Sequence, residues 1–149
     1  MMGLSYDMLT WSFLSKISEY EFSEMGSQQR TDIVDGYMRR AAAKFRSTCR
    51  YDIGAADDNA REFSAEIQED IIEEVADIIS DGMIVEWLKP FVNQQDNWQL
   101  LLNTRDFTSH SPAELLFRVR GAYDSARKEF TNKMREFSYS HGDLTDLHT

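Results

Sequence analysis

The sequence predicts an all-α fold: a helical bundle of three long helices plus shorter helices, with an extended C-terminal tail. Apolar residues recur at steps of three and four along most of the chain, the spacing of one helical face. No segment alternates apolar and polar residues for long enough to indicate a sheet, and prolines and glycines are few. A chain of 149 residues is the size of one domain. We therefore expect a single helical domain over residues 1–142 and a tail over 143–149.

Short apolar stripes predict the first two helices. Residues 7–17 place Leu9, Phe13 (or Leu14) and Ile17 on one side, and a loop with Gly26 follows. A second helix is expected over 28–48, with this apolar stripe: Ile33, Val34, Tyr37, Met38, Ala41, Ala42 and Phe45. Cys49 extends the stripe, so we expect a buried thiol. A lone cysteine excludes an internal disulfide.

The third helix is expected in a strongly acidic stretch, residues 57–86. The stretch holds eleven of the 26 acidic residues and one base, so its charge of −10 equals that of the whole chain. Apolar residues at helical steps run from Ala60 to Ile78, and Asp57 or Asp58 is expected to cap the helix. Asp81-Gly82 is expected to break or bend it. Beyond that point a further apolar segment should kink or end at Pro90, and 98–102 predicts a short extra turn.

The last helix has the clearest start. Ser111 is expected at the cap, Pro112 at the first helical position and Glu114 three residues after the cap. The seam that follows repeats almost as in a coiled coil: Leu116, Val119, Tyr123, Ala126, Phe130, Met134 and Phe137. Gly121 within it predicts a close backbone approach. His141-Gly142 should end the helix.

Composition and motifs argue against several classes of function. No run of about 18 apolar residues and no signal-peptide pattern is present, so we expect a soluble protein made in a reducing cytoplasm, without a membrane partner. A pI of 4.7 argues against sequence-independent nucleic-acid binding. The acidic stretch lacks the Glu-x-x-His step of a di-iron site. Ser109-His110-Ser111 does not suggest a catalytic triad, because Ser111 is better explained as a helix cap. We expect no catalytic residues, no metal and no cofactor.

Three segments carry a resemblance to a known family. They are MIVEWLKPFV at 83–92, DFTSHSPAELL at 106–116 and FSYSHGDL at 137–144. Together with the helical pattern they resemble the head–tail connector (neck or adaptor) proteins of tailed bacteriophages.

The resemblance implies a structural virion protein, not an enzyme. It implies a homo-oligomeric ring, expected to be dodecameric, docked beneath the portal protein and joined to the next neck or tail-completion protein. The protein would be assembled in the bacterial cytoplasm and located in the virion neck, with DNA passing through the ring without sequence-specific binding. C-terminal segments of such proteins reach onto a partner, which would give a role to Tyr139, Asp143, Leu144 and Leu147. A negative helix lining the channel is our own hypothesis.

Charge predicts how copies would meet. We expect basic faces of the second and last helices to contact the acidic helix of the next copy. The expected interface residues are Glu66, Glu69, Asp70, Glu73 and Asp77 on the acidic side, with Arg39, Arg40, Lys44, Arg118 and Arg127 on the basic side. The alternative is an acidic regulatory protein that mimics DNA and binds a basic partner.

Overall fold

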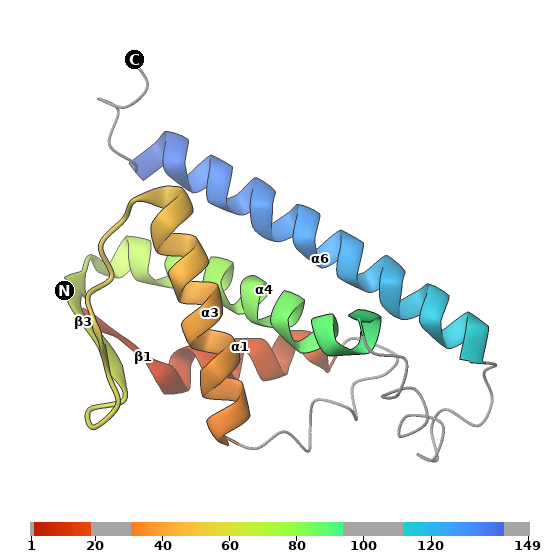
Figure 1. Ribbon diagram of the computed structural model, residues 1–149. Coiled ribbons are helices and arrows are strands. Elements are labelled where there is room, and N and C mark those ends of the chain that lie inside the picture. Colours follow the sequence, from red (N-terminus) through yellow and green to blue (C-terminus); the bar gives the residue numbers. More distant parts are fainter. Residues whose placement is uncertain (1, 19–30, 94–111, 142–149) are drawn as a thin grey trace.

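The computed structural model describes residues 2–18, 31–93 and 112–141, and within them the chain is mostly helical (Figure 1). The elements are β1 (Met2–Ser5), α1 (Tyr6–Ile17), α3 (Thr31–Cys49), β2 (Ala56–Asp57), β3 (Glu62–Ile67), α4 (Glu69–Asn93) and α6 (Pro112–His141). The prediction of a mostly helical chain is confirmed for this part, whereas the all-α class is wrong in one respect, since a small sheet is present. Residues 28–30, the Ser111 cap, the short turn over 98–102 and the tail over 143–149 lie outside the described residues.

Helix α4 is the centre of the bundle. Figure 1 shows α6 running alongside it, α3 crossing it, and α1 packed near its middle. From Val75 to Leu88 nearly every side chain of α4 is buried, whereas Glu69, Asp70, Glu73 and Glu74 in its first turns are exposed. The sequence suggested one strongly negative helix on the surface. Instead, most of this helix lies in the core and only its beginning presents carboxylates to solvent.

A small antiparallel sheet, in the order β1-β3-β2, covers one end of the bundle. The expectation of no sheet is therefore wrong, and so is the helical start at Ala60. Phe63 and Ile67 are buried while Glu62, Ser64 and Glu66 are exposed, so β3 does alternate. Four residues separate the two buried side chains, a spacing that fits a strand as well as a helix. The strand that decides between them, β1, lies about sixty residues away in the sequence.

The turn between β2 and β3 uses the aspartate that was expected to cap a helix. Asp57 Oδ1 accepts hydrogen bonds from the backbone amides of Asn59 and Ala60, at 3.0 and 3.1 Å. Arg61 closes the turn with φ of 54°, in the left-handed region. The helix cap expected at Asp57 or Asp58 is therefore wrong, because Asp57 stabilises a hairpin turn and not a helix start.

Asp81-Gly82 does not break the helix, because α4 is continuous from Glu69 to Asn93 and passes Pro90 by three residues. A Cβ atom on Gly82 would lie 2.6 Å from the Phe130 ring and 2.9 Å from Ala41 Cβ. Glycine is needed here for close approach of α3, α4 and α6, and not for a turn. The close approach predicted at Gly121 is not found within the described ranges, where no neighbouring atom lies within 4 Å of a Cβ at that position.

The seam of α6 and the thiol of α3 lie as expected in the core. Val119, Phe130, Met134 and Phe137 of α6 are buried against the rest of the bundle. Cys49 is 2 % exposed and donates to the Met134 carbonyl oxygen at 3.4 Å. Burial raises the pKa of this thiol above its ordinary value. Cys49 is therefore a packing residue that joins the end of α3 to α6.

Candidate interaction site: a basic groove and an acidic end

Two aspartates and two lysines form an ionic cluster that joins α1, α4 and α6. Lys16 Nζ of α1 lies 2.7 Å from Asp77 Oδ1 and 2.8 Å from Asp81 Oδ1, and it also contacts the Ser80 hydroxyl at 2.8 Å. Lys133 Nζ of α6 lies 2.8 Å from Asp77 Oδ2 and 2.6 Å from Asp81 Oδ2. Each carboxylate is thus shared by both ammonium groups. Lys133 Nζ also lies 3.4 Å from Glu129 Oε1 on its own helix. The positive charges of the cluster are therefore fully paired within the chain, and the cluster connects three helices.

The pKa values of this cluster follow from its contacts. Burial alone would lower the pKa of Lys133, but hydrogen bonds to Asp77 and Asp81 outweigh it and raise that pKa above the ordinary value. Burial alone would raise the pKa of Asp77, yet hydrogen bonds from Lys133 and Lys16 lower it. Both charged forms are therefore favoured in the folded state.

We expect acid to weaken the fold through Asp77. Because its folded pKa lies below its unfolded value, its contribution to stability is complete above pH of about 5 and is lost as pH falls through about 4 and below. Urea denaturation of the wild type and of Asp77→Asn, measured from pH 7 to 3, should show a stability difference that shrinks with acid. A difference that stays constant over this range would contradict the assignment.

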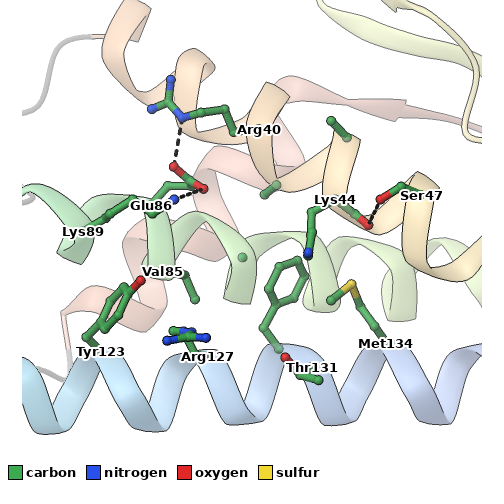
Figure 2. A pocket seen from close by; sticks show the side chains of 14 residues that line it. Arg40, Lys44, Ser47, Val85, Glu86, Lys89, Tyr123, Arg127, Thr131 and Met134 are labelled. Carbon is green, nitrogen blue, oxygen red and sulfur yellow. Dashed lines mark hydrogen bonds and ion pairs between the residues drawn. The ribbon is translucent and has the colours of Figure 1, made fainter.

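A cavity in the described part of the chain is a groove between α3 and α6, with α4 as its floor (Figure 2). Its volume is about 660 Å³, within the range of ligand pockets. The apolar part of its lining includes Ala41, Val85, Phe130 and Met134, all buried. Four cationic side chains surround this part: Arg40, Lys44, Lys89 and Arg127. We call it the basic groove.

Among the described residues, Glu86 is the only acidic side chain that lines the basic groove. Its Oε2 accepts from Arg40 Nε at 2.9 Å and its Oε1 lies 3.5 Å from Lys89 Nζ, so it is shared between two of the four cations. Lys44 and Arg127 form no ion pair with any other described residue, although Arg127 lies 5.6 Å from the centroid of the Tyr123 ring. Figure 2 shows Lys44 extending from α3 toward α6, on whose side Arg127 lies. The groove therefore keeps a positive charge within an acidic protein.

A second, negatively charged surface is formed by exposed carboxylates of β3 and of the first turns of α4. We call this the acidic end, and its members are Glu62, Glu66, Glu69, Asp70 and Glu73. All five are exposed, and none forms an ion pair with another residue in the described ranges. On the continuous helix α4, Glu73 lies nine positions before Gly82, the first residue of that helix that lines the groove, about 13 Å along the axis. One chain thus carries a negative and a positive surface that do not meet.

The structure divides the predicted interface residues into two sets. Arg39 pairs with Asp58 at 2.7 Å, Arg40 with Glu86, and Asp77 with both lysines of the cluster, all within the chain. The Arg39 and Tyr6 hydrogen bonds hold the pKa of the exposed Asp58 below its usual value. The predicted residues that keep exposed charges without a pair in the described part are these: Glu66, Glu69, Asp70, Glu73, Lys44 and Arg127.

Two other predicted contributors have different outcomes. Arg118 is exposed on α6 and also has a contact within the chain. Tyr139 is 74 % exposed near the end of α6. Asp143, Leu144 and Leu147 lie outside the described residues. Sequence reasoning missed Lys16 and Lys133 as partners of Asp77, and it gave no role to Glu86. The sequence signal for these two lysines was weak: each lies three residues after a core phenylalanine of its own helix.

Neither a metal site nor a membrane span is found in the described part of the chain. Within residues 2–18, 31–93 and 112–141, no group of three or more His, Cys, Asp or Glu side chains could hold a metal ion. No helix in those ranges has the length and apolar character needed to cross a bilayer. No protein-family model matches the chain, and no curated protein or solved structure is significantly similar to it.

Proposed function

We propose that the protein is a structural component of the neck of a tailed bacteriophage. Copies would form a ring that joins the portal to the next neck or tail component and lets DNA pass. The observation that carries the proposal is the separation of unpaired charges into the acidic end and the basic groove. Two different, complementary patches on one chain associate head to tail, and such contacts close into rings when the rotation permits. The location in the phage neck is proposed because three sequence segments resemble the connector proteins found there.

The net charge of −10 supports the part of the proposal that concerns DNA. A negative wall repels phosphates, so DNA can slide past it without adhering. Pairing the basic groove between copies would remove exposed positive charge from the assembled ring. The channel would then keep mainly carboxylates.

Assembly is tested by the mass of the particles. We expect the purified protein, alone or mixed with a portal protein, to form large rings that light scattering measures and electron microscopy displays. Rings held by charge should be weaker at 1 M salt, where the Debye length is about 3 Å. A species that stays monomeric or dimeric with and without the portal would exclude the ring.

Reversal of single charges should weaken this assembly. Glu73→Lys and Lys44→Glu each place like charges across the expected interface, so each should raise the concentration needed for half-assembly at least tenfold. The combined variant should recover part of the loss, because the pair is restored with opposite polarity. Glu136→Lys, an exposed acid of α6 outside both surfaces, is the matched control. Normal assembly of both single variants would show that this interface is wrong.

A second candidate is favoured by the acidic end itself. Its exposed carboxylates resemble a row of phosphates, and a DNA-mimicking regulator would present them to a basic partner protein. Such a regulator is typically a monomer or dimer, so the same mass measurement separates the two functions. Saturable binding of the monomer to a DNA-binding protein, released by duplex DNA, would support the mimic.

A further inference from the structure

We infer that the basic groove is a receptor for the first turns of α4 of a second copy, with Glu69, Asp70 and Glu73 as the inserted side chains. This inference rests on the proposed self-association and names the two surfaces that would carry it. Every part of the receptor comes from three helices that also pack against one another in the core. The site is thus formed in the single chain before any partner binds.

Charge is the first argument for this occupant. The groove has four cations and one acid, and Lys44 and Arg127 are without an ionic partner in the described part of the chain. Carboxylates brought from outside would form charge-assisted hydrogen bonds with them, which are roughly twice as strong as neutral ones. The acidic end holds carboxylates that lack such partners. The carboxylates of the acidic end can therefore pair with the cations of the basic groove.

The walls of the groove are the second argument. Ala41, Val85, Phe130 and Met134 give it an apolar part, while Ser47 and Thr131 add hydroxyl groups. A glutamate side chain has an aliphatic stem below its charged end, so it can pack against such a wall and still reach a cation. Ile71, half-buried between Asp70 and Ile72, adds apolar surface at the acidic end. A cavity of about 660 Å³ has room for several such side chains.

The contact must form between copies. Gly82, the first residue of α4 that lines the groove, lies nine positions after Glu73, about 13 Å along the rigid helix axis, so the acidic end cannot fold back into the groove of its own chain. The contact is also heterologous, since one copy supplies the groove and the next supplies the insert. A polynucleotide is the less favoured occupant, because the surrounding chain repels phosphates. Duplex DNA is therefore included in the test.

Zero-length cross-linking tests the contact in the intact protein. A carbodiimide joins an amine to a carboxylate that already touches it, so Lys44 should become linked to Glu69, Asp70 or Glu73. Mixing nitrogen-14 and nitrogen-15 copies before the reaction identifies links between chains in the mass spectrum. Lys44→Arg keeps the charge but loses the amine, so it should assemble normally and lose the link. Assembly without any linked peptide from Lys44 would overturn the inference.

Two further variants separate the shape of the groove from its charge. Ala43→Trp should fill the groove and raise the concentration for half-assembly at least tenfold, whereas Thr48→Trp, on the same helix but not lining the groove, should not. Arg127→Gln should also weaken assembly at least tenfold, because a charged hydrogen bond is lost. Equal assembly of Ala43→Trp and Thr48→Trp would overturn the inference. Protection of the Lys44 amine from acetylation by acetic anhydride in the presence of duplex DNA, but not on self-association, would overturn it as well.

The outcomes distinguish this inference from the proposed function. Links between Lys44 and the acidic end in small open oligomers would support the groove and contradict the ring. Closed rings without those links, unaffected by Ala43→Trp, would support the ring and contradict the groove. Absence of both would contradict both.

Discussion

Replacing Lys133 with methionine is expected to destabilise the protein by about 2–3 kcal/mol. Removal of one partner from a buried ion pair costs about 3–5 kcal/mol, because the remaining charge loses its compensation. The cost is smaller here since the Lys133 side chain is 28 % exposed and Lys16 still contacts both aspartates. Methionine keeps the apolar stem, so the loss measured by urea denaturation at pH 7 reports mainly the charge.

Lys128→Met is the matched control for this prediction. Lys128 lies on the same helix, is exposed, and forms no ion pair within the described part of the chain. Its replacement should change the free energy of unfolding by less than about 0.5 kcal/mol. A second check is the pair Lys133→Met and Asp81→Asn, whose combined loss should be smaller than the sum of the single losses. Equal effects of Lys133→Met and Lys128→Met would contradict the role given to the cluster.

Alanine at two of the helical glycines, Gly82 and Gly121, should have opposite effects. Alanine favours a helix over glycine by about 1 kcal/mol, so Gly121→Ala, at an exposed position with open space, should stabilise the protein by about 0.5–1 kcal/mol. Gly82→Ala places a methyl group 2.6 Å from the Phe130 ring and 2.9 Å from Ala41. Forced overpacking costs about 1–3 kcal/mol, which we expect to exceed the gain in helix propensity.

The direction of the Gly82 effect can be checked with a smaller neighbour. Phe130→Leu removes the ring that the new methyl group would strike, so Gly82→Ala should cost less in the Phe130→Leu background than in the wild type. Thermal and urea denaturation of the four variants measure this. A stabilising effect of Gly82→Ala in the wild-type background would show that α4 and α6 can separate at no cost.

The periodicity of apolar residues predicted which segments are helical better than it predicted which side chains of those helices are buried. The seam of α6 and the stripe of α3 could be predicted because one face of each is buried and the other is charged. In α4 this contrast disappears beyond Val75, since three helices surround it. The acidic stretch therefore suggested a surface helix, and Asp81-Gly82 suggested a turn. Their real role depends on Lys16, Lys133 and Phe130, which are distant in the sequence.

The strand β3 and the basic groove were beyond sequence reasoning for a related physical reason. A six-residue strand with two buried residues four apart also fits a helix, and only pairing with β1 decides. The groove combines side chains from α3, α4 and α6, and no spacing along one helix reveals it. Lys44, Arg127 and Glu73 were named correctly as exposed charges. That Arg40 and Asp77 are already paired within the chain could only be learned in three dimensions.

The pairing of Met2 with Ile67 has a consequence for how the chain matures during synthesis. The first strand leaves the ribosome early but has no hydrogen-bonding neighbour until residues 62–67 have also emerged. Bringing the ends of a segment of this length together costs conformational entropy before any hydrogen bond of the sheet forms. Pairing of β1 with β3 is therefore slower than local helix formation. We expect helices α1 and α3 to form first and the amino-terminal strand to dock last. A bulky fusion ahead of Met2 should therefore slow this final step more than it changes the finished fold.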